Sequence, residues 1–327
     1  MKLSELGEFG LIDRIRQAGG ESKARVGIGD DCAAVEVSAG ELLLTSSDLL
    51  LEGVHFRTEW TDYFSLGCKA VAVNVSDIAA MGGTPHAIFL GLAAPAETPV
   101  AQLEELIRGV REEAELHGAE LLGGDTCRSL AGLTLAITVQ GHVPSEQMVQ
   151  RRGAQAGDRV WVSGCLGDSA LALAALQQGH QPDPELALRH HRPQARVALG
   201  RALAEQGLAR AMIDVSDGLL ADLGHLLRAS GVGAEVEVAQ IPLSTSFRSH
   251  VAQRMQNMEL ALHGGEDYEL LFCCPPQRDA DLLKVAEQLG QPLTPIGTVS
   301  AEPGMRLIGL EEIGVKLGAR GFDHFRH

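Results

Sequence analysis

Aromatic side chains are scarce in this sequence. Only 4% of its 327 residues are Phe, Trp or Tyr, whereas hydrophobic residues together make up 45%. A core of this composition has to be packed mainly by Leu, Val, Ile and Ala. The length exceeds that of a typical single domain and suits two lobes of α/β type.

Positive charge is also in short supply. The chain has 27 Lys and Arg residues against 43 Asp and Glu residues, which gives a formal net charge of −16. Nucleic-acid-binding proteins normally carry a basic face, and no run of Lys or Arg occurs here, so we expect no nucleic-acid partner. If such an acidic chain handles anionic phosphates, bound divalent cations are the obvious source of positive charge.

Long apolar runs and paired cysteines are missing as well. No stretch approaches the roughly 20 apolar residues needed to cross a bilayer, and residues 1–17 are typical of an amphipathic helix rather than a signal peptide. The six cysteines form no CxxC pair, which argues against a zinc site and suits reduced thiols. We therefore expect a cytoplasmic protein with no membrane partner.

Strand-like and helix-like segments alternate along the chain. The polar, glycine-containing stretch 144–158 predicts a boundary between a first domain, 1–143, and a second, 144–327. The predicted fold class is α/β (α+β) with two lobes. Strands are predicted at 41–45, 86–93, 120–122, 133–143, 159–163, 211–215, 268–274 and 293–299. Helices are predicted at 64–81, 100–117, 168–178, 193–206, 217–230 and 279–289.

Acidic residues recur beside glycines or hydroxyl groups in the first half of the chain. Asp30 and Asp31 belong to GIGDDCA, and Ser46, Ser47 and Asp48 open SSDLLLEGVHF. Such groups offer the hard oxygen ligands that Mg²⁺ accepts. A solvated turn is the alternative interpretation of the Gly-Asp-Asp segment.

The segment NVSD at 74–77 places polar groups inside an otherwise apolar helix. Asn74 and Asp77 are three residues apart and share one helix face. Burying a carboxylate among Ala and Val is costly unless it is paired or coordinated. A helix N-cap formed by Ser76 and Asp77 is an equally good interpretation of this segment alone.

Three further clusters have the same character. They are LLGGDT at 121–126, IDVSDGLLADL at 213–223 and HGGEDYELLF at 263–272. Paired glycines before an acid let backbone N–H groups approach a polyphosphate while the carboxylate meets its metal. A turn is the alternative interpretation of the first of these clusters, and capping is the alternative for the other two. Taken together, the five clusters predict a site with several Mg²⁺ ions that performs phosphoryl transfer, although no Walker, protein-kinase or GxGxxG motif is present.

These motifs, in this order and over nearly the whole chain, resemble the thiamine-monophosphate kinase family. The resemblance also includes the C-terminal RGFDHF. It implies a two-lobed fold in which the N-terminal lobes of two subunits pair into a β-barrel, as a homodimer, with ATP in a cleft near the dimer interface. Related families, such as aminoimidazole ribonucleotide synthetase, selenophosphate synthetase and a hydrogenase maturation factor, share only some of the motifs.

The resemblance also assigns roles to individual residues. The Mg²⁺ ligands it implies are Asp30, Asp31, Ser46, Ser47, Asp48, Asp77, Asp125, Asp214 and Asp217, with Asp30 either supporting Asp31 or sharing its role. Gly124, Asp125, Arg151 and Ser216 would contact ATP. His55, Glu266 and Phe322 would contact thiamine monophosphate. Ser47 stands where the family often has Thr, and Phe322 where Tyr or Trp is common. Without the resemblance, His55 suits a surface histidine and Phe322 a core residue.

The implied reaction is transfer of the γ-phosphoryl group of ATP to thiamine monophosphate, giving thiamine diphosphate. The acceptor phosphate is already ionised, so direct in-line attack requires no strong base, and no phosphoenzyme is expected. Catalysis would depend on the metal cluster held by Asp31, Asp48, Asp77, Asp125 and Asp214. The alternatives are another ATP-dependent synthetase of the same superfamily and a non-catalytic relative that binds nucleotide or metal.

Overall fold

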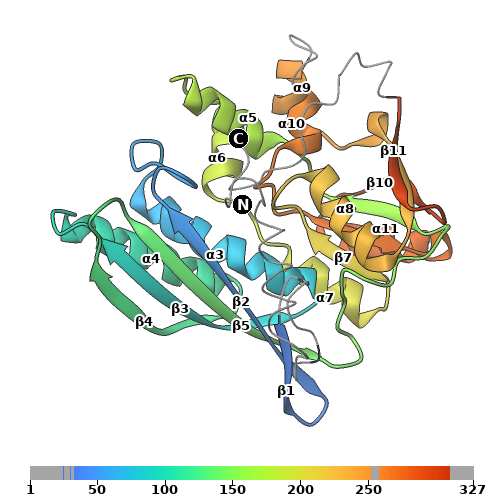
Figure 1. Ribbon diagram of the computed structural model, residues 1–327, viewed down its shortest axis with the longest axis horizontal. Coiled ribbons are helices and arrows are strands. Elements are labelled where there is room, and N and C mark those ends of the chain that lie inside the picture. The colour runs from blue at the N-terminus through green and yellow to red at the C-terminus, as the bar shows by residue number, and fades with distance from the viewer. Residues whose placement is uncertain (1–24, 26–29, 31–32, 252–257, 310–327) are drawn as a thin grey trace, which may run out of the picture.

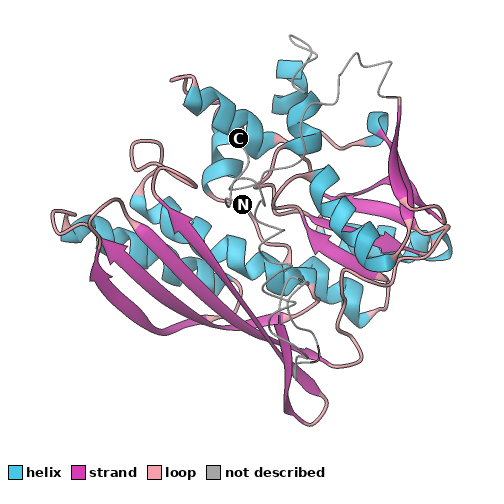
Figure 2. Cartoon of the chain, viewed as in Figure 1, coloured by secondary structure: helices cyan, strands magenta, loops and turns pink. Residues whose placement is uncertain are grey.

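Two β-sheets with their covering helices make up the part of the chain that we describe. The structure is a computed structural model, and it describes residues 25, 30, 33–251 and 258–309. The sheets lie side by side, each with helices packed against it (Figures 1 and 2). This confirms the predicted mixed α/β fold. The predicted N-terminal helix, Asp31 and Phe322 lie outside the described residues.

The first sheet is built by the first half of the chain. Its strand order is β1-β2-β5-β3-β4, and its neighbours are antiparallel except for β3 and β4, which are parallel. In β2, Leu42, Leu44 and Leu50 are buried, so alternate side chains of this strand point into the core. The strands are β1 (Ala33–Ser38), β2 (Glu41–Leu51), β3 (Thr84–Ala94), β4 (Glu120–Arg128) and β5 (Thr134–Pro144).

Two helices cover one face of this sheet. Helix α3 (Tyr63–Ala80) begins after Asp62, whose side chain accepts a hydrogen bond of 2.8 Å from the Ser65 N–H. Helix α4 (Val100–Leu116) packs against it. The contact needs glycine, because a Cβ added to Gly109 would lie 2.1 Å from the Phe64 carbonyl oxygen. Most of α3 is buried, which explains why its sequence is mainly apolar.

The second sheet has the order β11-β8-β10-β6-β9-β7. Adjacent strands in this sheet are antiparallel, except for β8 and β11, which are parallel to each other. The strands are β6 (Arg159–Ser163), β7 (Ala211–Asp214), β8 (Gly233–Glu237), β9 (Leu270–Cys274), β10 (Leu293–Ser300) and β11 (Gly304–Ile308). The helices are α5 (Asp168–Gln177), α6 (Pro184–His191), α7 (Val197–Glu205), α8 (Leu219–Ser230), α9 (Thr245–Val251), α10 (Met258–His263) and α11 (Asp279–Leu289), with 3₁₀ turns at Val238–Gln240 and Pro276–Arg278.

The C-terminal end of α3 joins the two sheets. Ala79 and Ala80 belong to a buried cluster that also contains Trp161 and Phe272 of the second sheet. Helix α7 crosses α3 so closely that a Cβ on Gly200 would lie 2.1 Å from the Ala79 carbonyl oxygen. The two halves of the chain therefore share a core along this helix.

Two interpretations of the sequence are wrong in the fold. Ser76 and Asp77 do not start a helix, since α3 runs without interruption from Tyr63 to Ala80. Asp217 does not cap α8, because that helix follows Gly218 and has no side-chain cap. In the part of the chain that the structure describes, no helix combines the length and apolar character that crossing a membrane requires.

Candidate active site

Strand β2 and helix α3 hold the first group of polar residues. The Ser46 hydroxyl donates a 2.5 Å hydrogen bond to the Asp77 carboxylate. The Asp48 N–H donates to the Asn74 side-chain oxygen at 3.0 Å, and the Asn74 amide donates in turn to the Ala70 carbonyl at 2.9 Å. These bonds fix the middle of β2 (Glu41–Leu51) against the polar face of α3, so Ser46, Asp48 and Asp77 lie close together.

Helix α3 also reaches the second sheet at this point. The Ser76 hydroxyl donates to the Asp214 carboxylate at 2.6 Å, and both side chains are buried. Asp214 is the last residue of β7, so the NVSD and IDVSD segments, 138 residues apart, meet through one hydrogen bond. The contact satisfies a carboxylate whose burial would otherwise be costly.

A buried carboxyl supports the loop after β7. Asp222 is 2% exposed and accepts hydrogen bonds of 3.1 Å from the N–H groups of Ser216 and Asp217. Burial raises the pKa of Asp222 well above its usual value, and the nearby charges of Asp217 and Asp214 raise it further. Negative charge is therefore concentrated around this loop.

The segment 264–269 lies against the same loop. The Glu266 N–H donates to the Ser216 carbonyl and the Tyr268 N–H to the Val215 carbonyl, each at 2.8 Å. Both Glu266 and Tyr268 have positive φ angles, 65° and 51°. Residues other than glycine adopt such backbone angles only where the surrounding structure enforces them. Burial raises the pKa of Tyr268, with further contributions from Glu266, Asp48, Asp214 and Asp217. The phenol thus lies within electrostatic reach of all these carboxylates.

His55 and Glu266, both expected to contact substrate, also lie near each other. The His55 Nδ1 accepts a 3.0 Å hydrogen bond from the Leu51 N–H, which leaves Nε2 to carry the proton of the neutral ring. His55 acts electrostatically on the Glu266 carboxyl, which also forms a 2.8 Å ion pair with Lys69 of α3.

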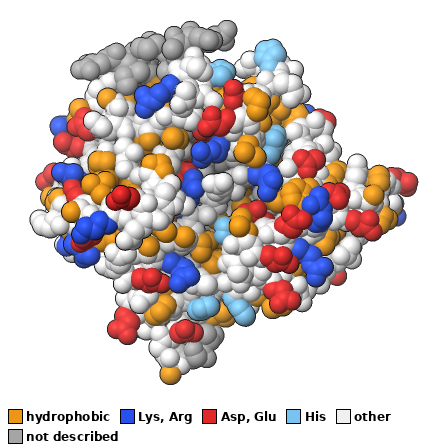
Figure 3. All heavy atoms as spheres, turned by 180° about the vertical axis from the view of Figure 1, so that it is seen from behind, with side chains coloured by type: hydrophobic (Ala, Val, Ile, Leu, Met, Phe, Trp, Pro, Cys, Tyr) orange, Lys and Arg blue, Asp and Glu red, His pale blue; other side chains and the backbone are white. Residues whose placement is uncertain are grey.

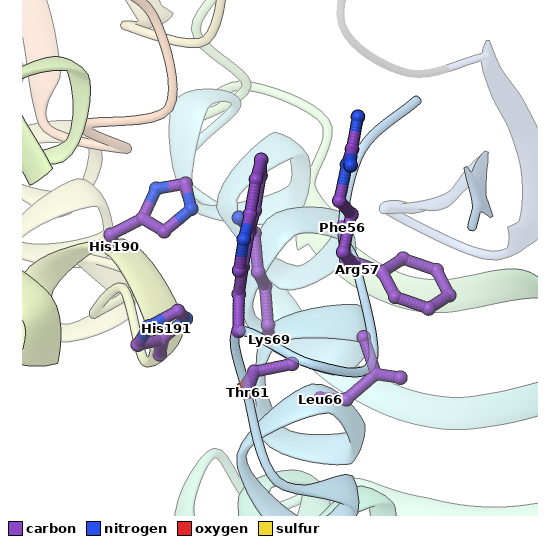
Figure 4. Close-up of a pocket in the computed structure, with 8 residues that line it drawn as sticks. Phe56, Arg57, Thr61, Leu66, Lys69, His190 and His191 are labelled. Carbon is purple, nitrogen blue, oxygen red and sulfur yellow. The ribbon is translucent and has the colours of Figure 1, made fainter. Parts of the chain in front are cut away.

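A small pocket opens beside this ion pair (Figure 4). Its volume is about 10 Å³, room for roughly one water molecule. Lys69 and His190 project into it from α3 and α6. The residues that line it are Phe56, Arg57, Trp60, Thr61, Leu66, Lys69, His190 and His191.

Asp30 is not a solvated turn residue. Its side chain is 9% exposed and lies 3.9 Å from the Arg151 guanidinium, and its carboxylate accepts a 3.3 Å hydrogen bond from the Arg151 N–H. The charge of Arg151 also lowers the pKa of Asp222. Arg151 therefore lies between Asp30 and the loop that follows β7.

Two residues expected at the metal site lie apart from this group. The Ser47 hydroxyl bonds to β5, at 3.0 Å from both the Ile137 carbonyl and the Thr138 hydroxyl. Asp125 is exposed on the edge strand β4. It pairs with Gly91 of β3, Gly91 pairs with Ala136 of β5, and Ala136 pairs with Leu49 of β2, so these four residues form one row across the sheet. Side chains in one row share a face, so Ser47 and Asp125 belong to the face opposite α3.

Gly124, next to Asp125, has a conformation that only glycine accommodates. Its φ angle is +152°, and an added Cβ would lie 1.8 Å from the Leu90 carbonyl oxygen. The backbone of β4 thus approaches β3 unusually closely just before Asp125.

The acidic group does not form a closed metal cage among the described residues. Within residues 25, 30, 33–251 and 258–309, no three His, Cys, Asp or Glu side chains are grouped so that they could hold a metal ion. The donor chemistry nevertheless fits Mg²⁺, because Asp48, Asp77, Asp214 and Asp217 offer carboxylate oxygens around one loop and one helix face. Burial raises the pKa of Asp222, and the nearby carboxylates of Asp217 and Asp214 raise it further.

Sequence reasoning missed three residues of this site. Asp222 and Tyr268 lie in the acidic motifs at 213–223 and 263–272, but only their neighbours in these motifs were proposed as site residues. Lys69 has the clearest signal: it is a lysine in the apolar run CKAVAVNV, eight residues before Asp77. That spacing places Lys69 and Asp77 near one helix face, and a buried lysine requires a partner.

Comparisons with known proteins show which family the chain resembles. Residues 29–143 match the N-terminal domain, and residues 155–309 the C-terminal domain, of the AIR synthase related proteins. The chain is 40% identical to the thiamine-monophosphate kinase of Salmonella typhimurium, over 98% of each chain. It is 39% identical to that of Aquifex aeolicus, over 99% of this chain and 100% of the relative.

Solved structures give the same result. The structure described as AaThiL complexed with AMPPCP and TMP superimposes with a TM-score of 0.85, at 36% identity, and the match covers 99% of each chain. The hydrogenase maturation protein HypE of E. coli matches with a TM-score of 0.71 at 21% identity, over 95% of this chain and 96% of that one; this likeness concerns the fold alone. From the full-length identity and the arrangement of the acidic motifs, we conclude that the chain belongs to the thiamine-monophosphate kinase family, within the AIR synthase related proteins.

Proposed function

We propose that this chain transfers the γ-phosphoryl group of ATP to thiamine monophosphate, giving thiamine diphosphate. The observation that carries the proposal is the bond between Ser76 and Asp214, which brings two acidic motifs of the family together from opposite halves of the chain. Support also comes from the full-length identity to thiamine-monophosphate kinases and from a similar structure described as complexed with AMPPCP and TMP.

We assign Mg²⁺ binding to the acidic residues of β2, α3 and the loop after β7. With them we propose Asp30 and Asp31, so that this set of ligands comprises Asp30, Asp31, Ser46, Asp48, Asp77, Asp214 and Asp217. Ser47 and Asp125 are the remaining ligands we propose, and they belong to the face of the first sheet opposite α3. Bound Mg²⁺ supplies charge neutralisation between two anionic substrates. The hydroxyl groups of Ser46 and Ser76 donate to Asp77 and Asp214, and these bonds orient the two carboxylates.

For ATP we propose contacts with Gly124, Asp125, Arg151 and Ser216. Arg151 can bind phosphate oxygens through its fork of N–H donors, and Asp30 holds its backbone in place. Gly124 has no Cβ because β3 approaches it closely, and its backbone is the part we propose to contact ATP. Ser216 lies on the loop that Asp222 supports.

For thiamine monophosphate we propose contacts with His55, Glu266 and Phe322. Glu266 pairs with Lys69 of α3 and His55 lies near Glu266, whereas Asp77 lies two turns beyond Lys69 on that helix. Eight residues of helix span about 12 Å, so the ring end and the phosphate end of an elongated acceptor can be held at once. The acceptor phosphate then attacks the γ-phosphorus in line, without a covalent enzyme intermediate.

We also propose a homodimer formed through the open face of the first sheet. Leu49 and Leu122 of this sheet are 56% and 52% exposed, and exposed apolar groups of this kind suit an interface. Ser47 and Asp125 belong to the same face, so a partner there would cover two of the proposed ligands.

Two further assignments go with this function. Residues 1–143 form the nucleotide-binding, metal-binding and dimerisation domain and residues 144–327 the domain that completes the site, in keeping with the matched ranges. We expect a cytoplasmic location, because Cys68, Cys127, Cys165, Cys273 and Cys274 are all free thiols.

The test is direct identification of the product. Purified protein is incubated with ATP, MgCl₂ and thiamine monophosphate, and the nucleotides and thiamine phosphates are separated by chromatography. Formation of thiamine diphosphate and ADP in equal amounts is expected. Consumption of ATP without thiamine diphosphate, or no ATP consumption at all, would exclude the proposed reaction.

A further inference from the structure

Lys69 is not among the residues proposed to bind Mg²⁺, ATP or thiamine monophosphate, but it forms an ion pair with Glu266, which is one of them. The Lys69 ammonium lies 2.8 Å from the Glu266 carboxylate, and the lysine side chain is only 4% exposed, against 25% for the glutamate. The pair also joins the two halves of the chain, because Lys69 belongs to α3 and Glu266 to the loop between α10 and β9.

Glu266 is held firmly by its backbone. Its N–H bonds to the Ser216 carbonyl, and a Cβ on the preceding Gly265 would lie 2.2 Å from that same oxygen. The backbone therefore has little freedom to shift, and its positive φ angle is maintained by these contacts. What remains adjustable is the carboxylate, which Lys69 contacts through one oxygen.

The groups facing this carboxylate are Lys69, His190, His55 and Tyr268. The His190 Nδ1 lies 3.5 Å from the second Glu266 oxygen and 2.9 Å from the Ser169 hydroxyl. Burial and the charge of Lys69 lower the pKa of His190 to about 3, so its ring is neutral near pH 7. Burial favours a protonated Glu266, but the charge of Lys69, 2.8 Å away, acts in the opposite direction, and the pKa of Glu266 is lowered.

We propose that Lys69 is a positioning residue for the acceptor substrate: it keeps the Glu266 carboxylate ionised and in a fixed orientation so that this carboxylate can bind thiamine monophosphate. The inference rests on the proposed function, because it takes Glu266 as a substrate contact. Lys69 already neutralises the charge of Glu266. The carboxylate therefore serves as a hydrogen-bond acceptor for thiamine monophosphate and not as a counter-ion to a charge on this substrate.

The experiment compares Lys69→Met with the wild type and with Lys284→Met. Lys284 is a matched control, because it is 70% exposed and pairs with Asp281 on a surface helix far along the chain. For Lys69→Met we expect the KM for thiamine monophosphate to rise roughly 10- to 100-fold, as loss of a buried charged partner does. The KM for ATP and kcat should change by less than about threefold.

The pH dependence separates a positioning role from a structural one. Without Lys69, burial raises the pKa of Glu266, so the KM ratio of variant to wild type should grow as the pH falls from 8 to 6. Lys69→Arg should restore most of the wild-type KM. The double variant Lys69→Met/Glu266→Gln has no carboxylate to titrate, so its KM ratio to the wild type should not depend on pH. If Lys69→Met alone fails to fold, this double variant serves as the second test.

The outcomes are distinct. If the wild type forms no thiamine diphosphate, the proposed function fails. If the wild type is active and Lys69→Met has an unchanged KM for thiamine monophosphate, the inference about Lys69 is overturned. It is also overturned if Lys69→Met loses kcat and affinity for ATP as much as affinity for thiamine monophosphate, at every pH.

Discussion

Hydroxyl groups decide how the acidic residues of this site are oriented. Ser46 donates to Asp77, and Ser76 donates to Asp214. A serine can make such a bond without adding charge, so the carboxylates keep their full negative charge for a cation. The sequence indicated that aspartates and serines are close neighbours, but it could not indicate which serine serves which aspartate, because these pairs are 31 and 138 residues apart.

Replacing a carboxylate by an amide should separate catalysis from folding. In Asp77→Asn and Asp214→Asn the side-chain oxygen can still accept from serine, so the melting temperature should change little. The lost negative charge should weaken Mg²⁺ binding and lower kcat by roughly 100-fold or more. Steady-state kinetics at several MgCl₂ concentrations, together with thermal melting, measure both effects. Wild-type turnover by both variants would remove these residues from the metal site.

His190 makes stability depend on pH. Its pKa is lowered to about 3 by burial, whereas in the unfolded chain it is about 6.5. Below pH 6.5 only the unfolded chain binds the proton, so stability present at higher pH is lost as the pH falls towards 3. This loss amounts to about 2 kcal/mol between pH 7 and pH 5.

Urea unfolding at pH 7 and pH 5 tests this effect. The variant His190→Asn should lose less stability between the two pH values than the wild type, by about 2 kcal/mol. His180 is exposed, and His180→Asn serves as the control that should behave like the wild type. An equal pH dependence in all three proteins would contradict the assignment to His190.

At the scale of elements, strong periodic patterns gave reliable predictions. Strand β6 has the predicted bounds, and the predicted helix at 64–81 corresponds to α3. Strands β1, β8 and β11 were missed. Strands β8 and β11 are held in the sheet by pairing with segments distant in the sequence, which local sequence does not reveal, whereas β1 forms a hairpin with β2. Helix α6 was also missed, although Asp183 and Pro184 provide a helix-start signal: the Asp183 side chain accepts from the Glu185 N–H.

The crossing of α3 and α7 should tolerate no side chain. In Gly200→Ala the new Cβ would meet the backbone of Ala79 at 2.1 Å, so the helices would have to separate, with a destabilisation of roughly 1–3 kcal/mol or more. Gly224 is the matched control in α8, because an added Cβ there comes no closer than 3.1 Å, to the flexible Arg228 side chain. Gly224→Ala should be neutral or stabilising. Denaturant unfolding of both variants measures the difference, and equal stability would show that the crossing is less tight than described.

At the scale of the whole molecule, charge is well dispersed over the surface. On the face in Figure 3, Lys and Arg are interspersed with Asp and Glu instead of forming one basic stripe. The concentrated charge lies inside, around Asp214, Asp217 and Asp222. Candidate residues for the site could be named from the sequence because the motifs that carry them are local. The sequence could not show that these residues divide between the α3 side and the open face of the first sheet, because the register of the strands determines the face to which each side chain belongs.

The open face of the first sheet should hold two subunits together. Leu49→Glu places a charge on this face, and we expect the variant to shift from dimer to monomer in sedimentation velocity. Because Asp125 belongs to the same face, thiamine diphosphate formation should fall along with dimer content. Leu283 is a matched control, 55% exposed on α11, and Leu283→Glu should leave both measurements unchanged. A monomeric wild type would contradict the dimer.

The shared core at the end of α3 has a practical consequence for anyone who wants to cut the protein into pieces. Ala79 and Ala80 pack among Trp161, Phe272 and other residues of the second sheet, so a fragment ending near residue 143 would expose an apolar helix end to water. Such a fragment should be recovered as aggregate, and co-expression with the remaining residues as a split protein should rescue it. The boundary that is visible in the sequence is therefore a poor place for truncation.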